Sequence, residues 1–158
     1  MIKVAILTAS DSCARGERKD VSGRTIRDML SEDKFEICEK KIVADNYEAI
    51  AKQLQHFSDN TEIDLVLTTG GTGLGPRDVT PEATISVCER LVPGLSEIIR
   101  REGYSKSKNA VLSRGTAGIR KGTLIINLPG SPKAVRESLE IILDVLVHAV
   151  KMLHGGGH

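Results

Sequence analysis

The sequence predicts a single-domain α/β protein: a three-layer α-β-α fold with a mostly parallel central sheet. Short apolar, β-rich runs alternate with stretches of helical spacing in the order strand, helix, strand, helix, strand, helix. This alternation favours parallel strands joined by crossover helices that cover both faces of the sheet. At 158 residues the chain suits one domain and is long enough to bury a hydrophobic core. We therefore expect one domain over residues 1–153, followed by a flexible tail over residues 154–158.

The first half of the chain is expected to hold three strands and two helices. Residues 2–8 are apolar and β-rich, which is typical of a central strand, and the polar residues 10–20 form a loop after it. Helical spacing then places Ile26, Met29 and Leu30 on one face of a helix. This helix is predicted over residues 22–32. The remaining predicted elements of this half are a strand over 35–43, a helix that begins at Asp45 or Asn46, and a strand over 63–68.

The second half is expected to hold three helices and two further strands. A capping residue followed by proline indicates a helix start at Thr80-Pro81 and another at Ser131-Pro132. Lys121-Gly122 is a turn signal between two β-rich segments. The predicted elements are a helix over residues 80–90, a break over 91–94, a helix over 95–103, strands over 116–119 and 123–127, and a last helix up to residue 153.

A glycine-rich turn over residues 70–75 follows the strand predicted at 63–68 and precedes the helix start at Thr80. Its four glycines let backbone amides approach a ligand closely. A strand, a glycine-rich turn and a helix start together form a binding site for an anion such as phosphate. The same pattern is also typical of a plain tight connection. It matches neither the P-loop, since no Gly-Lys-Ser/Thr follows, nor the dinucleotide-binding G-x-G-x-x-G pattern.

Asp78 lies at the rim of this turn and changes the expectation for the ligand. A carboxylate close to a phosphate repels it by several kcal/mol at low dielectric, unless a cation lies between them. With Asp45, which follows the second strand, Asp78 forms a carboxylate pair suited to Mg²⁺ on a nucleoside triphosphate. Two alternatives stay open. Asp45 is equally suited to cap the helix that it precedes, and Arg77 either contacts a phosphate or lies in solvent.

Four polar or glycine-bearing loops follow strands of the predicted sheet. In a parallel sheet, ligands bind at the carboxyl ends of the strands, so we expect these loops to share one edge. Ser131 is either a helix N-cap or part of a second anion site, and Ser113 and Arg114 either meet a phosphate or lie on the surface. Asp20 is interpreted as a loop charge. The four loops are Ser10-Asp11, Asp45, Gly70 to Asp78, and Pro129-Gly130-Ser131.

Composition and charge exclude several classes of partner. The 22 basic and 21 acidic residues leave a net charge of +1, which argues against a nucleic-acid binder. Aromatic residues make up 3% of the chain, so a base-stacking surface is not expected either. Cys13, Cys38 and Cys88 have neither disulfide nor metal-ligand spacing, which fits a reducing cytoplasm. The apolar start at residues 1–7 is too short to cross a membrane, so no membrane partner is expected.

Three stretches resemble the signatures of the molybdopterin-binding proteins of molybdenum cofactor synthesis. The first is Thr-Thr-Gly-Gly-Thr-Gly at residues 68–73, followed by Arg-Asp-Val-Thr-Pro-Glu-Ala at residues 77–83. The second is Asn-Leu-Pro-Gly-Ser-Pro-Lys-Ala-Val at residues 127–135, and the third is Ser-Asp-Ser at residues 10–12. Together they extend the resemblance over nearly the whole chain. It implies the fold of the molybdopterin-binding proteins and a homotrimer.

The resemblance also implies an activity: adenylylation of molybdopterin, in which Mg²⁺ and ATP are required and pyrophosphate leaves. It assigns Asp45 and Asp78 to catalysis and to the metal, and it suggests a molybdenum-insertion protein as a further partner. Two alternatives are a MoaB-type paralogue that binds molybdopterin without efficient adenylyl transfer, and a non-catalytic scaffold of the same fold. The expected binding residues are Thr69, Gly70, Gly71, Thr72, Gly73 and Gly75 for the nucleotide phosphates, and Ser10, Asp11, Ser113, Arg114, Pro129, Gly130 and Ser131 for molybdopterin.

Overall fold

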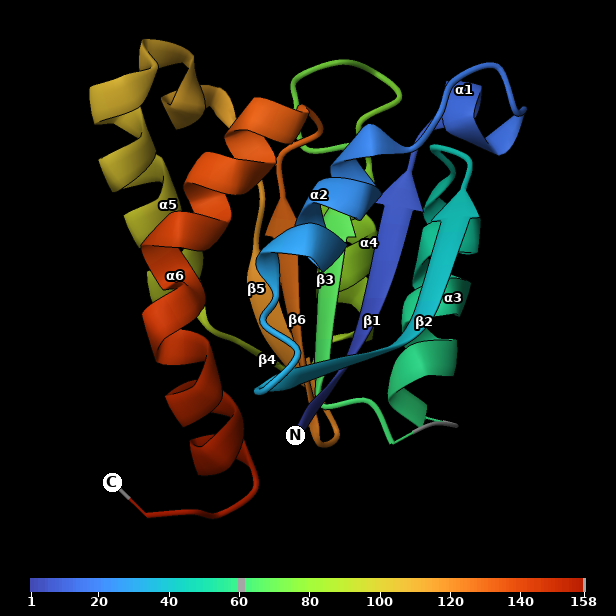
Figure 1. Ribbon diagram of the computed structural model, residues 1–158. Coiled ribbons are helices and arrows are strands. Elements are labelled where there is room, and N and C mark those ends of the chain that lie inside the picture. Colours follow the sequence, from blue (N-terminus) through green and yellow to red (C-terminus); the bar gives the residue numbers. More distant parts are fainter. Residues whose placement is uncertain (60–61, 158) are drawn as a thin grey trace.

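The computed structural model describes residues 1–59 and 62–157, and its strands form one six-stranded sheet (Figure 1). The strands are β1 (Ile2–Ala9), β2 (Phe35–Val43), β3 (Leu65–Thr69), β4 (Arg90–Leu91), β5 (Ala117–Arg120) and β6 (Thr123–Leu128). Their order across the sheet is β2-β1-β3-β6-β5-β4. The first four strands in this order pair in parallel, whereas β5 pairs antiparallel with β6 and β4 pairs antiparallel with β5. The prediction of a mostly parallel sheet is therefore confirmed.

Helices cover both faces of the sheet, which confirms the three predicted layers (Figure 1). The helical elements are α1 (Asp11–Ala14), α2 (Val21–Met29), α3 (Tyr47–Asp59), α4 (Thr80–Val87), α5 (Pro93–Lys106), the 3₁₀ helix η1 (Lys108–Leu112) and α6 (Pro132–Leu153). One core cluster joins α2, α5 and α6 to the sheet, and a second cluster joins α3 and α4 to its other face.

The alternation of side chains along the central strands divides the apolar residues between these two cores. Val4 and Ile6 of β1 belong to the core under α2 and α6, whereas Ala5 and Leu7 belong to the core under α3 and α4. All residues of β3 and β6 are buried, as expected for parallel strands covered on both faces. Burial of each large aliphatic side chain contributes about 1.5–3 kcal/mol to folding. Because both faces are closed, the ends of the strands remain as the place for a ligand site.

Several predicted boundaries and connections were wrong. The helix expected over residues 80–90 ends at Val87, because residues 89–92 pair with β5: Glu89 N donates to Ile119 O at 2.9 Å. The helix expected over 95–103 runs instead from Pro93 to Lys106, since Pro93 fits the first turn. The predicted helix over 22–32 stops at Met29. Inside the regions expected to be irregular lie α1 and η1, which are too short to show helical periodicity in the sequence.

The chain beyond α6 begins with hydrogen-bonded turns. Amides of Gly155 and Gly156 donate to the carbonyls of Met152 and Lys151 and complete the end of the helix. His158 lies outside the described residues, and the flexibility of the tail over 154–158 stays a prediction. Within residues 1–59 and 62–157, no helix combines the length and the apolar character needed to cross a membrane.

Candidate functional site

A cleft of about 340 Å³ opens at the carboxyl ends of the parallel strands, where the sequence predicted a ligand site. It brings together eight of the predicted site residues from four separate loops. These residues are Ser10, Asp45, Thr69, Gly70, Gly71, Asp78, Gly130 and Ser131. The expectation that the four loops share one edge of the sheet is therefore confirmed.

The glycine-rich turn approaches its neighbours so closely that side chains are excluded. Gly70 has a φ of +93°, and a Cβ placed on it would lie 2.2 Å from the carbonyl oxygen of Ala9. Gly71 has a φ of +70°, and its Cβ would lie 2.2 Å from Thr80 Oγ1. These conformations are unfavourable for other residues. Glycine therefore lets the end of β3 pass directly beside the end of β1 and the start of α4.

The prediction that the Thr80 side chain caps α4 was wrong. Thr80 is the first residue of the helix, Val79 occupies the N-cap position, and no side chain within residues 1–59 and 62–157 caps this end by a hydrogen bond. The Thr80 amide instead donates to the Gly71 carbonyl at 3.1 Å, which fixes the helix start against the glycine-rich turn. The Thr80 hydroxyl is fully buried and has no hydrogen-bond partner in the part of the chain that the structure describes.

Asp45 is free of the capping role that the sequence left open. Asn46 caps α3 instead, because its Oδ1 accepts a hydrogen bond from Ala49 N at 2.9 Å. Asp45 Oδ2 accepts a hydrogen bond from the amide of Asp11 at 3.0 Å. Burial raises the pKa of Asp45, a hydrogen bond from Asp11 lowers it in part, and the charges of Asp11 and Asp78 raise it further. The charge of Arg77 lowers it, so burial is the main reason why the charged form of Asp45 is disfavoured, and a cation beside it would offset that cost.

Asp78 folds back into the glycine-rich turn. Its Oδ2 accepts a hydrogen bond from Gly75 N at 2.9 Å, and a Cβ on Gly73 would lie only 2.9 Å from the same oxygen. The carboxylate therefore occupies space that side chains at positions 73 and 75 would fill. Among the described residues, Oδ1 of Asp78 and Oδ1 of Asp45 receive no hydrogen bond, so each carboxylate keeps one oxygen for a ligand at the shared cleft.

This arrangement fits a divalent cation that is completed by a substrate. Mg²⁺ in nucleotide sites is commonly held by one or two carboxylates together with phosphate oxygens and water. No group of three or more His, Cys, Asp or Glu side chains that could hold a metal occurs within residues 1–59 and 62–157. The pair formed by Asp45 and Asp78 therefore suits an ion that arrives with a polyphosphate.

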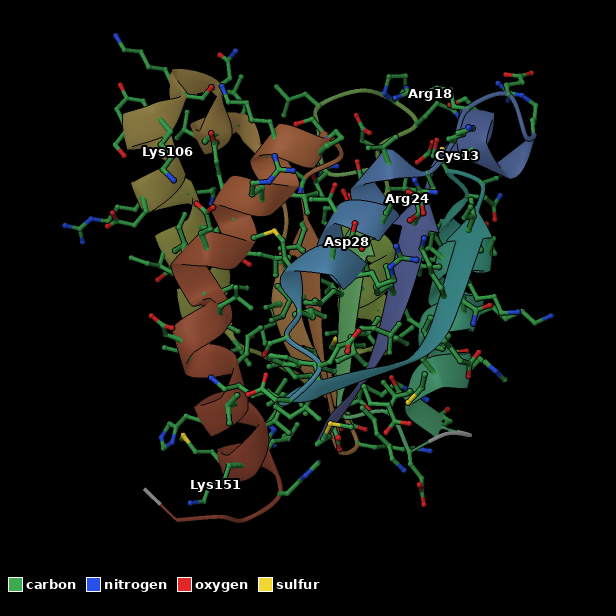
Figure 2. The ribbon with its side chains drawn as sticks, in the orientation of Figure 1. Cys13, Arg18, Arg24, Asp28, Lys106 and Lys151 are labelled. Carbon is green, nitrogen blue, oxygen red and sulfur yellow. The ribbon has the colours of Figure 1, made fainter. Side chains whose placement is uncertain are left out.

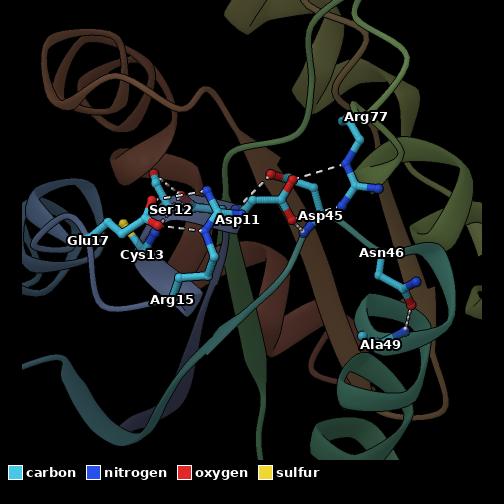
Figure 3. Close-up of polar contacts among 10 residues, drawn as sticks. Asp11, Ser12, Cys13, Arg15, Glu17, Asp45, Asn46, Ala49 and Arg77 are labelled. Atoms are coloured by element: carbon cyan, nitrogen blue, oxygen red, sulfur yellow. Dashed lines mark hydrogen bonds and ion pairs between the residues drawn. The ribbon is translucent and has the colours of Figure 1, made fainter.

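Asp11 belongs to an ion pair at the edge of the cleft (Figure 3). Arg77 donates to both of its carboxylate oxygens, from Nε at 3.0 Å and from Nη2 at 2.9 Å. Hydrogen bonding from Arg77 holds the pKa of Asp11 below its usual value, with a further contribution from the backbone of Asp45. Arg77 is therefore engaged with a protein carboxylate, and the carboxylate of Asp11 is occupied by Arg77 and by the Asp45 amide.

The loop at residues 129–131 abuts the glycine-rich turn. Thr69 Oγ1 donates to the Pro129 carbonyl at 2.6 Å, and a Cβ on Gly130 would lie 3.4 Å from Gly70 Cα. Ser131 Oγ accepts a hydrogen bond from Ala134 N at 3.2 Å, which makes Ser131 the N-cap of α6. The capping interpretation of Ser131 is therefore confirmed, and its role toward a substrate stays a prediction.

A second cavity of about 520 Å³ adjoins the first, and Ser131 lines both. It takes in four further predicted residues, which are Thr72, Gly73, Ser113 and Pro129. The remaining three, Asp11, Gly75 and Arg114, line neither cavity. Arg114 stabilises the turn through its guanidinium, which donates to the carbonyls of Gly73 at 2.8 Å and Asp78 at 2.7 Å. The same guanidinium pairs with Glu82. Plain exposure therefore does not describe Arg114, and its contact with a phosphate stays a prediction.

A sequence profile described as "Probable molybdopterin binding domain" matches residues 5–148. The chain belongs to this family. Molybdopterin adenylyltransferase of Helicobacter pylori is 43% identical over 156 residues, covering 98% of this chain and 89% of that protein. Molybdopterin adenylyltransferase of Escherichia coli is 37% identical, covering 94% and 80%. The crystal structure of the molybdopterin biosynthesis enzyme MoaB of Thermus thermophilus superposes with a TM-score of 0.93 at 50% identity and covers 98% of both chains.

The interpretation of Asp20 as a plain loop charge was wrong. In this molybdopterin-binding domain, Asp20 lines the cleft and caps α2, with Oδ1 accepting from Gly23 N at 2.9 Å and Oδ2 accepting from Thr8 Oγ1 at 2.7 Å. An aspartate just before a helical run is a capping signal that could have identified it. The neighbouring residues Arg18, Lys19 and Ser22, which also line the cleft, carry no comparable signal in the sequence.

Proposed function

We propose that this protein transfers the adenylyl group of ATP to molybdopterin in the biosynthesis of the molybdenum cofactor, releasing pyrophosphate. The relatives named molybdopterin adenylyltransferase, which match over nearly the full chain, support this activity. The observation that carries the proposal is the convergence of Asp45, Asp78 and the glycine-rich turn on one cleft. This convergence provides both parts of a nucleotide site, namely backbone amides for phosphate and carboxylates for a cation.

The transfer needs positioning and charge balance rather than a nucleophilic side chain. An oxygen of the terminal phosphate of molybdopterin attacks the α-phosphorus of ATP, the new phosphoanhydride bond forms, and the bond to pyrophosphate breaks. In such transfers the protein mainly aligns the two reactants and offsets developing charge. Asp45 and Asp78 would hold Mg²⁺, which when bound neutralises the repulsion between the carboxylates and the polyphosphate. The amides of residues 70–75 would hold the phosphates.

The two adjoining cavities support a site for two substrates. The smaller cleft contains the carboxylate pair and is therefore assigned to the polyphosphate. The larger cavity is assigned to molybdopterin, and it is lined by Thr72, Ser113 and Pro129 together with apolar side chains of α5 and α6. Ser131 lines both cavities, so the reacting phosphates would meet beside the start of α6.

A pyrophosphate-release assay tests this proposal. With ATP, Mg²⁺ and molybdopterin, the protein is expected to release pyrophosphate and to form adenylylated molybdopterin, which mass spectrometry identifies. Omitting Mg²⁺ or molybdopterin should remove both signals. A protein that binds molybdopterin tightly without releasing pyrophosphate would fit the alternative, a MoaB-type paralogue that only binds, or a scaffold. In a crystal soaked with ATP and Mg²⁺, phosphate density should appear against residues 70–78.

The proposal extends to assembly and location. We propose a homotrimer that works in the cytoplasm and passes its product to a molybdenum-insertion protein. Exposed apolar side chains at Leu91, Val145 and Met152 offer a surface for contacts between copies. Light scattering measures the mass in solution directly, and a monomer would contradict the assembly proposed here.

A further inference from the structure

We propose that Arg18 and Lys19 form a cationic arm that binds the polyphosphate of the substrate and the pyrophosphate that leaves. The inference rests on the proposed function, because it names residues that act on the same nucleotide. It concerns the part of the cleft lined by the loop after α1, which the reasoning from Asp45 and Asp78 does not use. The arm lies on the loop between α1 and α2, at residues 15–20.

Both residues line the cleft, and both are exposed to solvent. Figure 2 shows Arg18 near the carboxyl ends of the strands, between α1 and the turn that follows β3. Neither the Arg18 guanidinium nor the Lys19 ammonium forms a hydrogen bond or an ion pair with any residue in the ranges 1–59 and 62–157. Two cations at a cleft without an internal anionic partner are available to an anionic ligand.

The neighbouring arginines differ from Arg18, because each is already paired. Arg15 donates to both carboxylate oxygens of Glu17 at 3.0 Å, and Arg77 is paired with Asp11. Arg114 is paired with Glu82 and with backbone carbonyls. A phosphate bound by any of these three would compete with an existing ion pair for the guanidinium. Arg18 and Lys19 can bind it without that competition.

The backbone on both sides of the arm is fixed by hydrogen bonds. On one side, Glu17 N donates to the Ser12 carbonyl at 2.9 Å, and Gly16 makes the turn with a φ of +75°. On the other side, Asp20 caps α2 and accepts the Thr8 hydroxyl, so that residue 20 is tied to the end of β1. The arm therefore projects from a defined position, and its side chains have little backbone freedom to lose on binding.

Charge balance in the cleft explains why such an arm is useful. The cleft contains the carboxylates of Asp20, Asp45 and Asp78. A triphosphate adds further negative charge, and one divalent cation cannot neutralise the sum. Negative charge also accumulates on the leaving pyrophosphate as its bond to the α-phosphorus breaks. Arg18 and Lys19 place two positive charges where this charge develops, which favours the transition state as well as binding.

The test is the affinity for inorganic pyrophosphate with Mg²⁺, measured by calorimetry on the full chain. The variants are Arg18→Gln, Lys19→Gln and the double variant. Arg24→Gln is the matched control, because Arg24 is an exposed arginine on α2 that does not line the cleft (Figure 2). We expect about a 10-fold loss of affinity for each single variant, a larger loss for the double variant, and less than about a 2-fold change for Arg24→Gln. The affinity of the wild-type protein should also fall more steeply with salt than that of the double variant.

Unchanged pyrophosphate affinity in the double variant would overturn the proposal, and so would an equal loss in Arg24→Gln, which would reveal a general charge effect. Thermal melting of each variant checks that it is folded, which we expect because both side chains are exposed. The proposed function is tested separately by turnover of the wild-type protein. A further outcome is that wild type releases no pyrophosphate from ATP while its binding of added pyrophosphate still depends on Arg18 and Lys19. That result would support the proposed role of Arg18 and Lys19 and contradict the proposed adenylyl transfer.

Discussion

Asp11 and Asp45 bind each other through reciprocal hydrogen bonds between backbone and side chain. The amide of Asp11 donates to Asp45 Oδ2, the amide of Asp45 donates to Asp11 Oδ1, and both distances are 3.0 Å (Figure 3). The two residues follow the adjacent parallel strands β1 and β2. Arg77, from the segment between β3 and α4, binds the carboxylate of Asp11 in turn. Three loops of the site are therefore tied together through one carboxylate, and the orientation of Asp45 depends on Asp11.

The first prediction concerns Asp11 as a positioning residue. Asp11→Ala should lower kcat by about 10-fold or more and raise the Mg²⁺ concentration needed for half-maximal activity, because the Asp45 amide loses its acceptor and Arg77 loses its partner. Asp11→Asn keeps an acceptor for the Asp45 amide and should recover part of the loss. If Asp11 bound molybdopterin directly instead, both variants would raise KM for molybdopterin and leave the Mg²⁺ requirement unchanged. Steady-state kinetics at varied Mg²⁺ and molybdopterin separates the two results.

The second prediction separates Asp45 from Asn46. Asp45→Asn should slow pyrophosphate release strongly while the melting temperature stays close to that of wild type, because the side chain does not cap α3. Asn46→Ala should show the opposite pattern, with a loss of about 1 kcal/mol in unfolding free energy and near-normal turnover. Urea unfolding and the release assay on both variants provide the comparison. A large loss of stability in Asp45→Asn would mean that Asp45 mainly supports the fold.

The third prediction concerns the charge of Asp78. Asp78→Asn keeps a carbonyl oxygen that can accept the Gly75 amide, so the turn should remain folded while the negative charge is lost. Pyrophosphate release should fall by about 100-fold or more, since this carboxylate is expected to hold the cation. Glu82→Gln is a suitable control, because Glu82 pairs with Arg114 behind the turn and does not line the cleft. Near-normal release by Asp78→Asn would remove the basis of the proposed metal site.

The position of the site was predictable because parallel strands impose it. The apolar run before Gly70 marks β3, and polar or glycine residues follow each parallel strand. The strand ends must then share one edge, whatever the details of packing. This reasoning needs only the alternation of strands and helices, which the pattern of apolar residues in the sequence indicates.

Local roles were less predictable, because they depend on partners distant in sequence. Asp45 and Asn46 are equally good caps by residue type. The amide of Asp11, which occupies Asp45, decides between them. The end of α4 is likewise set by pairing of residues 89–92 with β5. The sequence near the end of the helix gives no indication of this pairing.

The fourth prediction concerns the close approach at Gly70. Gly70→Ala should lower the unfolding free energy by more than about 1 kcal/mol, because φ is positive and the new Cβ would meet the Ala9 carbonyl oxygen at 2.2 Å. Gly94→Ala is the control, since a Cβ at that position in α5 meets no atom of the described residues within 4 Å. This control should be neutral or slightly more stable than wild type. Equal effects of the two variants in urea unfolding would contradict the steric argument.

The last prediction concerns acid stability and Asp59, at the end of α3. Its carboxylate accepts from Arg120 at 2.9 and 2.7 Å and lies 3.2 Å from Lys121 Nζ. Hydrogen bonding from Arg120 is the largest cause that lowers its pKa from 3.8 to about 2. Because the folded-state pKa lies below the ordinary value, the contribution of Asp59 is present above about pH 4 and is lost as the pH falls through about 2. The stability difference between wild type and Asp59→Asn should therefore be largest at neutral pH and should shrink between about pH 4 and pH 2.

Asp28→Asn, which removes an exposed ion pair with Arg27, should change stability little at neutral pH. Urea midpoints measured across this range would contradict the prediction if the Asp59→Asn difference did not change with pH.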